Sequence, residues 1–382
     1  MKIALVGNTI FHQGAEYAMV ALANGLAGKG HVVDVVLSQR QLDLQSAHPE
    51  WKGFELGDNV RIIINPHRRG RNSIFSLQRI MRQNGYDVVM SHASPFSPPL
   101  VFAAWGLRKK PLLIHVQHSG GTGVNDEGEL ISPVRTLGAL FHNFVIGQFD
   151  GVFGVSSGTS EGVARMMDFP RDRIFTVYNP VVDAIFHEKR KALPVHPWLR
   201  NPELPVVVAA GALVSNKRYP MLIEAFSEVL KLKKARLVIF GEGDRRCDCE
   251  QAVKRFGVSE FVSLPGFTDN LPAELKGASC FVVSSGVESF SIVCVEALAC
   301  GVPVVSTNCP YGPPEILKNG KYGILVENKN PHALAEGIAK VLDGNGINPT
   351  PDMVAPYTVE AVVDRYEKAI NELLQQKKDQ KK

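Results

Sequence analysis

Two glutamates, Glu288 and Glu296, carry the strongest chemical signal in the sequence, because they bracket the beginning of an expected helix. If that helix begins near Ser291, Glu288 precedes its first turn and Glu296 lies about one and a half turns in. The first backbone N–H groups of a helix have no partner within it, and the positive end of the helix dipole lies beside them. We therefore expect the N–H groups of Phe290, Ser291 and Ile292 to form an anion site.

A ligand that joins a diphosphate to two polyols matches this arrangement. The diphosphate of a nucleoside diphosphate sugar would meet the N–H groups, its ribose hydroxyls would meet Glu296, and its transferred sugar would meet Glu288. The alternative for two isolated carboxylates is one acidic residue favoured by the helix dipole and one further surface glutamate. The residues that follow other strands favour the ligand site.

A second group of residues follows the expected first strand of the second half of the chain. The loop 211–218 opens with Gly211 and ends with two adjacent cations, Lys217 and Arg218. Departure of a nucleoside diphosphate develops negative charge, so a cation placed here would stabilise the leaving group. A solvated Lys-Arg pair is the alternative.

The first half of the chain places a glycine and two histidines after its strands. Gly14, between the first strand and the first helix, would let backbone approach a ligand closely. The G-x-G-x-x-G fingerprint is absent, which counts against a dehydrogenase. His118 lies past a strand end beside glycines, where we expect a side chain that faces a cleft. His92 follows the preceding strand in the same way, although a lone histidine is more often structural.

Short β-branched runs alternate with longer amphipathic segments in both halves, which predicts βαβ units and parallel sheets. The fold class is therefore α/β, with two Rossmann-like parallel-sheet domains facing across a cleft. Ligands of such sheets bind beyond the carboxyl ends of the strands, where the residues above lie. The expected strands are 2–6, 32–37, 87–90, 112–116, 151–155, 174–177, 206–210, 236–240, 261–264, 280–284 and 302–306.

Charge and proline interrupt this pattern once, and the interruption predicts a boundary between domains. We expect an N-terminal domain over residues 1–188, a linker over 189–204 and a C-terminal domain over 205–356. A last amphipathic helix begins at Val359, and the segment 357–382 is expected to pack back on the N-terminal domain.

Composition excludes several classes of protein. The 42 basic and 38 acidic residues give a net charge of only +4, which does not indicate a nucleic-acid binder. The six cysteines have neither C-x-x-C nor zinc spacing, so we expect free thiols in a reducing compartment and no metal site. The first residues lead straight into a strand, and no stretch has the composition of a membrane-spanning helix. These features predict a cytoplasmic protein.

Together and in this order, the residues resemble the retaining, nucleotide-sugar-dependent glycosyltransferases of family 4, which have the GT-B fold. The resemblance covers nearly the whole chain and is most specific from about residue 206 to 330. It rests on the E-x7-E pattern with its flanking strands, on the segments 312–317 and 323–326, and on Tyr178-Asn179-Pro180-Val181 and Gly14-Ala15-Glu16 in the first half.

The resemblance implies roles for particular residues. Glu288, His118 and Lys217 would be catalytic, His118 would face the sugar and the acceptor, and Phe267 would line the base pocket. No metal and no cofactor are implied, because the donor, expected to be a UDP-sugar, is a co-substrate. The implied donor-binding residues are Gly14, Gly211, Lys217, Arg218, Phe267, Glu288, Ser289, Phe290, Ser291, Ile292 and Glu296.

The implied reaction is transfer of a hexose-type sugar, with retention, to a glycan or lipid-linked acceptor in cell-surface polysaccharide or glycolipid assembly. Ala212 stands where the family often has arginine, so one phosphate cation is missing unless Arg218 substitutes, and Ser291 stands where glycine is common. A nucleotide-sugar epimerase on the same scaffold is one alternative. A non-catalytic nucleotide-sugar-binding subunit is the other, and Ala212 supports it.

Two segments of the first half suggest a further partner. Residues 66–71 are basic, and residues 102–110 join an apolar run to Arg108, Lys109 and Lys110. Such combinations suit an anionic membrane that carries a lipid-linked acceptor, which predicts peripheral attachment to its inner face. A solvated charge patch beside a core helix is the alternative.

Overall fold

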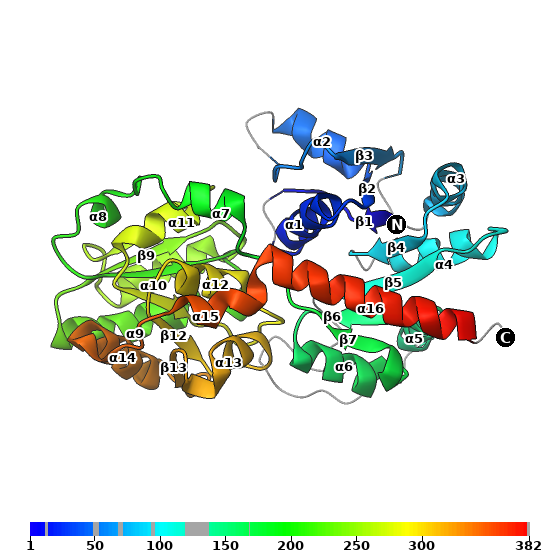
Figure 1. The fold of residues 1–382 in the computed structure, drawn as a ribbon. Helices are drawn as coiled ribbons and strands as arrows, with labels where there is room; N and C mark the ends of the chain where they lie inside the picture. Colours follow the sequence, from blue (N-terminus) through cyan, green and yellow to red (C-terminus); the bar gives the residue numbers. More distant parts are fainter. Residues whose placement is uncertain are drawn as a thin grey trace. The chain divides into compact units, whose positions relative to one another are not determined.

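The computed structural model describes residues 1–11, 14–48, 53–67, 72–92, 96–118, 137–167 and 169–379, with the backbone alone for 137–139. The chain forms two compact α/β units (Figure 1). The first comprises the described residues up to 118, residues 137–180, and the C-terminal residues from 359 onwards. Of the described residues, the second unit holds Val181–Thr358.

The first unit contains a sheet of seven strands in the order β3-β2-β1-β4-β5-β6-β7, and all neighbouring strands are parallel. The order reverses between β1 and β4, as in other doubly wound sheets. The strands are β1 Lys2–Val6, β2 Val32–Ser38, β3 Val60–Asn65, β4 Val88–Ser91, β5 Leu112–Gln117, β6 Gly151–Gly154 and β7 Ile174–Thr176.

Apolar stripes on the helices explain how they cover this sheet. Buried residues of α3, α4, α5 and α6 share one core with alternate residues of the strands, so these four helices cover one face. Helix α16 packs beside α1. The helices are α1 Gly14–Gly28, α2 Arg40–Ala47, α3 Ile74–Asn84, α4 Ser97–Trp105, α5 Leu137–Gly147, α6 Ser157–Met167 and α16 Val359–Asp379.

The second unit repeats this architecture with six parallel strands in the order β10-β9-β8-β11-β12-β13. Helices α9, α10 and α14 share a core with one face of its sheet. The strands are β8 Val206–Ala210, β9 Arg236–Phe240, β10 Val262–Gly266, β11 Cys280–Val283, β12 Val304–Thr307 and β13 Ile324–Val326. The helices are α7 Ala184–Lys189, α8 Pro197–Arg200, α9 Tyr219–Leu232, α10 Arg246–Arg255, α11 Leu271–Glu274, α12 Ile292–Ala299, α13 Gly312–Ile316, α14 Pro331–Lys340 and α15 Pro351–Val354.

The α/β class with two parallel sheets is confirmed, and the differences lie at the edges of the sheets. Strands β3 and β13 were not predicted, because β3 is an edge strand with Arg61 exposed and β13 has only three half-buried residues. The segment 189–204, expected to be a linker, belongs to the second unit. There the buried carboxylate of Glu274 accepts hydrogen bonds from the backbone N–H groups of Val195 and His196, at 2.9 and 3.2 Å.

The C-terminal helix α16 completes the core of the first unit. Tyr366 and Leu373 are buried, and the Tyr366 ring meets the Phe153 ring of β6 edge-on, with centroids 5.4 Å apart. Leu373 packs directly over Gly151, where an added Cβ would lie 2.4 Å from a Leu373 methyl carbon. A helix some 200 residues further along the chain therefore covers part of the first sheet at β6.

We expect Leu373→Ala to lower the free energy of unfolding of the first unit by about 3 kcal/mol, because it removes a buried side chain and leaves a cavity. Glu372→Ala on the same helix is the matched control, since Glu372 is exposed and should change stability by less than about 0.5 kcal/mol. Urea unfolding followed by circular dichroism measures both. Equal midpoints for the two variants would contradict a role of α16 in this core.

Candidate functional site

The candidate site of the second unit lies where the strand order reverses. Strands β8 and β11 are neighbours at the centre of the sheet, yet the chain leaves them in opposite directions across it. A crevice forms beyond the carboxyl ends of two such strands. The loop after β8 carries Lys217 and the loop after β11 carries Glu288, so the topology itself brings these two residues together.

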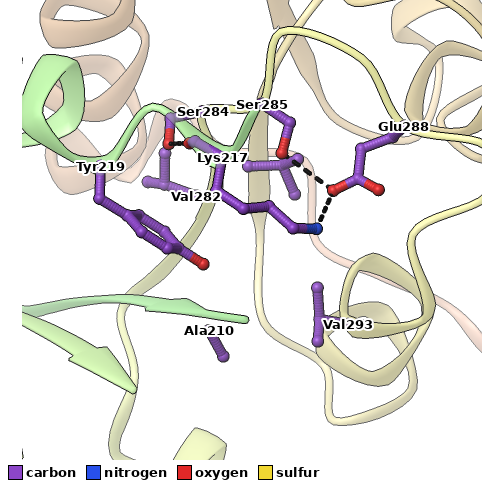
Figure 2. Close-up of a pocket in the computed structure, with 9 residues that line it drawn as sticks. Ala210, Lys217, Tyr219, Val282, Ser284, Ser285, Glu288 and Val293 are labelled. Carbon is purple, nitrogen blue, oxygen red and sulfur yellow. Dashed lines mark hydrogen bonds and ion pairs between the residues drawn. The ribbon is translucent and has the colours of Figure 1, made fainter. Parts of the chain in front are cut away.

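Lys217 and Glu288 form an ion pair at this point (Figure 2). Their side chains are 20% and 11% exposed, so the pair is screened by little water. The same Glu288 oxygen accepts a hydrogen bond from the Ser285 hydroxyl at 2.9 Å, and the Ser284 hydroxyl donates to the Lys217 carbonyl at 2.7 Å. A small pocket opens here, lined by Ala210, Lys217, Tyr219, Val282, Val283, Ser284, Ser285, Glu288 and Val293.

The backbone of Glu288 is fixed against a second loop. Its N–H donates to the Pro310 carbonyl at 3.2 Å, and its carbonyl accepts from the Gly312 N–H at 2.8 Å. A Cβ at Gly312 would lie 1.9 Å from the Phe290 carbonyl oxygen, so only glycine allows this close approach. The position of the Glu288 carboxylate is therefore set by main-chain contacts as well as by Lys217.

Gly211 makes room for the Lys217 side chain. Its φ of 147° belongs to glycine, and a Cβ there would lie 2.9 Å from the Tyr219 hydroxyl and 3.5 Å from Lys217 Cε. Burial raises the pKa of Tyr219, with Glu288 adding to the effect, so its hydroxyl stays protonated beside the ion pair. The placement of Gly211 next to Lys217 is what allows the loop after β8 to turn into the site.

Arg218, expected as a substitute phosphate cation, has other contacts in the structure. Its guanidinium donates to the Asn328 side-chain oxygen at 3.1 Å and lies against Gly286. Asn328 in turn donates to the Gly286 carbonyl at 3.1 Å. These bonds tie the loop after β8 to the loop after β11. A phosphate contact by Arg218 stays a prediction.

The start of helix α12 has the features of an anion site. The helix begins at Ile292, and its N-terminal flanking residue Ser291 adopts the left-handed conformation with φ 85° and ψ 75°. That conformation explains why glycine suits this position. The Ser291 hydroxyl is buried and has no hydrogen-bond partner in the described part of the chain. A buried hydroxyl that lacks a partner, at the positive end of a helix, suits a bound anion.

Glu296 lies in the middle of α12 and is partly buried. Burial raises the pKa of its carboxyl to about 7, and the Lys189 ammonium opposes this shift. Phe267, predicted for the base pocket, follows directly after β10 and is 52% exposed. A contact between Glu296 and a ribose, and one between Phe267 and a base, both stay predictions.

The first unit holds its candidate residues at the corresponding ends of its own strands. Gly14 opens α1, and His92 and His118 follow the neighbouring parallel strands β4 and β5. His92 Nδ1 and His118 Nε2 are 3.0 Å apart, so one ring donates a single proton to the other. Burial lowers the pKa of both rings, that of His118 to about 4, and both are neutral near pH 7. The meeting of Gly14 and His118 with the second-unit residues stays a prediction.

The sequence favoured a structural role for His92 and did not predict its contact with His118. That contact arises because β4 and β5 are neighbouring strands. His115 of β5 is buried, with Nδ1 3.1 Å from the Ser97 hydroxyl and Nε2 2.7 Å from the Gln117 side-chain oxygen. Residues 119–121, the glycine-containing segment after His118, lie outside the described residues. So do residues 68–71 of the basic segment predicted to contact a membrane.

Metal-ligating side chains and long apolar helices are the features to look for in the described ranges of the chain. Within them, no three His, Cys, Asp or Glu side chains gather as metal ligands would. All six cysteines are free thiols, and most of them are buried. No helix of the described chain has the length and apolar character needed to cross a membrane.

The raised pKa of Glu296 predicts a pH dependence of stability. Between the ordinary carboxyl pKa of 4.5 and about 7, the folded state binds more protons than the unfolded state. The free energy of unfolding should therefore fall as pH rises through this window, by up to about 3 kcal/mol. Glu296→Gln should remove that part of the dependence, whereas the exposed Glu260→Gln should leave it. Urea unfolding at several pH values measures the difference, and parallel curves for all three proteins would contradict the shift.

Comparison with known proteins shows which family the chain resembles. Residues 12–184 match the family model described as glycosyltransferase family 4, and residues 196–361 match glycosyl transferases group 1. A glycosyltransferase of Methanocaldococcus jannaschii is 29% identical over 345 residues, which cover 85% of this chain and 84% of the relative. N-acetyl-alpha-D-glucosaminyl L-malate synthase of Bacillus anthracis is 25% identical and covers 94% of both chains.

A solved structure shows the same fold over almost the full length. The crystal structure of Anabaena HepE in complex with UDP and glucose superposes with a TM-score of 0.77, covering 97% of this chain and 99% of that one at 17% identity. The two doubly wound sheets agree with this likeness. The chain belongs to the family 4 glycosyltransferases with the GT-B fold.

Proposed function

We propose that the protein transfers a hexose-type sugar from a nucleoside diphosphate sugar, a UDP-sugar by preference, with retention of the anomeric configuration. The proposed acceptor is a glycan or lipid-linked glycan of cell-surface polysaccharide or glycolipid assembly. The observation that carries the proposal is the Lys217–Glu288 ion pair beside the N-terminus of helix α12. A cation and the positive end of a helix suit a diphosphate, and the adjacent carboxylate suits sugar hydroxyls.

The ion pair indicates how donor binding would proceed. In the structure Glu288 is the counter-ion of the Lys217 ammonium. An incoming diphosphate offers more negative charge to Lys217 and to the first N–H groups of α12, so Lys217 would exchange its partner. Glu288 would then be released to accept hydrogen bonds from the sugar, while Ser285 still orients it. The pair thus compensates both charges until the donor binds.

The transfer step places the remaining charges. The bond between the anomeric carbon and the diphosphate oxygen breaks, and its electron pair stays on the diphosphate, where Lys217 and the helix N-terminus stabilise it. The acceptor oxygen bonds to the anomeric carbon from the same face, and its proton passes to the departing diphosphate oxygen. Glu288 orients the sugar and forms no covalent bond. His118, neutral near pH 7, would hydrogen-bond to the sugar or the acceptor.

The comparisons support the donor class. The Anabaena structure contains UDP and glucose, and the Bacillus anthracis relative makes an α-linked product by its name. An α-linked product formed from an α-linked nucleotide sugar corresponds to retention. The lipid-linked acceptor, and with it a place at the inner face of the membrane, is supported by the apolar and basic surface described in the next subsection.

One observation keeps a second function in view. Ala212 is exposed directly beside Gly211, where the family often has arginine, so the second phosphate cation is absent from this position. A non-catalytic nucleotide-sugar-binding subunit would tolerate that loss. Donor hydrolysis by the purified chain alone would exclude this function, and donor isomerisation without any acceptor would instead indicate an epimerase.

A thermal-shift screen with UDP-, GDP- and ADP-sugars tests the donor proposal. We expect a UDP-sugar and UDP to raise the melting temperature, because a ligand at about 100 times its Kd stabilises by about 2.7 kcal/mol. Uridine is the matched control and should have little effect, since it lacks the diphosphate. Stabilisation by none of the nucleotide sugars would overturn the proposal. NMR of the product then reports the anomeric configuration.

Glu288→Gln should separate donor binding from turnover. Loss of the carboxylate charge leaves Lys217 without its internal counter-ion, so UDP should bind about tenfold tighter. Turnover should fall about a hundredfold or more, because the sugar loses its charged hydrogen-bond acceptor. Glu260→Gln, on the surface of the same unit, is the control. Unchanged turnover in Glu288→Gln would remove its assigned role.

A further inference from the structure

The first unit exposes an apolar surface where α4 and α5 meet. Trp105 at the end of α4 and Leu140, Phe141 and Phe144 on α5 are each about half exposed, between 49% and 55%. The Trp105 ring meets the rings of Phe102 and Phe144 edge-on, with centroids 5.1 and 6.4 Å away. The four side chains thus form a connected patch, which we call the α4–α5 surface. Connected apolar patches on a protein surface mark binding sites.

Most of the charged residues beside this surface are basic. Arg108, Lys109 and Lys110 follow α4 directly and are all exposed. Helix α3, which packs beside α4, adds the exposed Arg79 and Arg82. The segments Ile74–Asn84, Ser97–Trp105 and Leu137–Gly147 contain no aspartate or glutamate at all. Lys109 has an acidic neighbour, Asp87 of the preceding turn, at 3.7 Å.

We propose that the α4–α5 surface docks the protein onto a bilayer of anionic lipids. Aromatic and leucine side chains on a helix face enter the boundary between headgroups and acyl chains, while lysine and arginine beside them meet the lipid charge. The aromatic ends of α4 and α5 and the run 108–110 provide both parts at one place. No covalent step is involved, and the surface is separate from the residues of the donor site.

The charge pattern argues against a second copy of the chain as the occupant. A symmetric dimer places the same patch on both sides of the interface. Arg79, Arg82 and residues 108–110 of both copies would then be brought close together, while the three helices carry no acidic residue and only Asp87, beside Lys109, offers negative charge. An anionic bilayer supplies the missing negative charge and also covers the exposed rings.

Co-sedimentation with lipid vesicles tests the proposal. The full chain should bind vesicles made of equal parts of phosphatidylcholine and phosphatidylglycerol. It should bind vesicles of phosphatidylcholine alone much more weakly. Binding to the anionic vesicles should decrease as the salt concentration rises. Trp105 provides a second readout, because its fluorescence should shift to shorter wavelength on binding. Trp105→Phe should abolish the shift and retain sedimentation. Failure of the parent protein to bind the anionic vesicles overturns the proposal.

Matched variants separate this surface from general charge and stickiness. Arg108→Gln/Lys109→Gln/Lys110→Gln should weaken binding about a hundredfold, since each cation near an anionic surface contributes about fivefold. Phe141→Ser/Phe144→Ser should weaken it about tenfold. The controls on the second unit are Lys231→Gln/Lys234→Gln/Lys254→Gln, with three exposed cations, and Leu193→Ser/Val195→Ser, with two exposed apolar side chains. Equal losses in the controls overturn the proposal.

Two further measurements keep the result interpretable. Urea unfolding checks that each variant is folded, and sedimentation velocity reports oligomeric state. A parent dimer that Phe141→Ser/Phe144→Ser dissociates would show a second copy on this surface and overturn membrane docking. UDP-induced thermal stabilisation should be the same in all variants. Loss of vesicle binding with intact UDP binding, or the reverse, therefore distinguishes failure of this proposal from failure of the proposed donor chemistry.

Discussion

The ion pair between Lys217 and Glu288 is the contact around which the second unit is arranged. Its two residues are separated by some 70 positions, and only the adjacency of β8 and β11 brings them together. The local backbone at each residue must also allow its side chain to reach the other. Gly211 opens the loop for Lys217, while Gly312 allows the main chain to hold Glu288. Removing an ion pair from water costs free energy. A largely buried pair whose two residues are held by such specific backbone contacts is therefore more typical of a functional site than of a pair that only stabilises the fold.

The electrostatics of helix α12 complement that pair. Its N-terminus presents a left-handed serine and a buried hydroxyl, and its middle carries a carboxyl whose pKa burial raises to about 7. The positive end of a helix dipole and a carboxyl with a raised pKa thus lie on one short helix. In the first unit the corresponding strand ends carry neutral, paired histidines instead. The two units therefore share a doubly wound topology but differ in the side chains at the carboxyl ends of their strands. The second unit has a charged Lys–Glu pair there, and the first has a pair of neutral histidines.

Much of the fold could be predicted from local pattern, because central strands of a parallel sheet are buried on both faces and read as β-branched runs. The bounds of β1, β8 and β9 agree with the expectation to the residue. The edge strands β3 and β13 could not be found in this way, since partial exposure breaks the run. For the site, the residue types after each strand were informative. The Lys217–Glu288 and His92–His118 contacts were not predictable, because they depend on strand order rather than on sequence distance.

The return of α16 to the first unit affects how the protein is made. A ribosome releases the N-terminal strands first, yet Gly151 of β6 remains uncovered until Leu373 has been synthesised. The described part of the second unit, residues 181–358, is one unbroken stretch of sequence and can fold as it emerges. The order of maturation is then opposite to the order of synthesis, with the later-made unit folded while the earlier one still waits for its last helix. Translational truncation between residue 358 and Leu373 would leave a folded second unit attached to an incomplete first one, a natural target for chaperones and proteases.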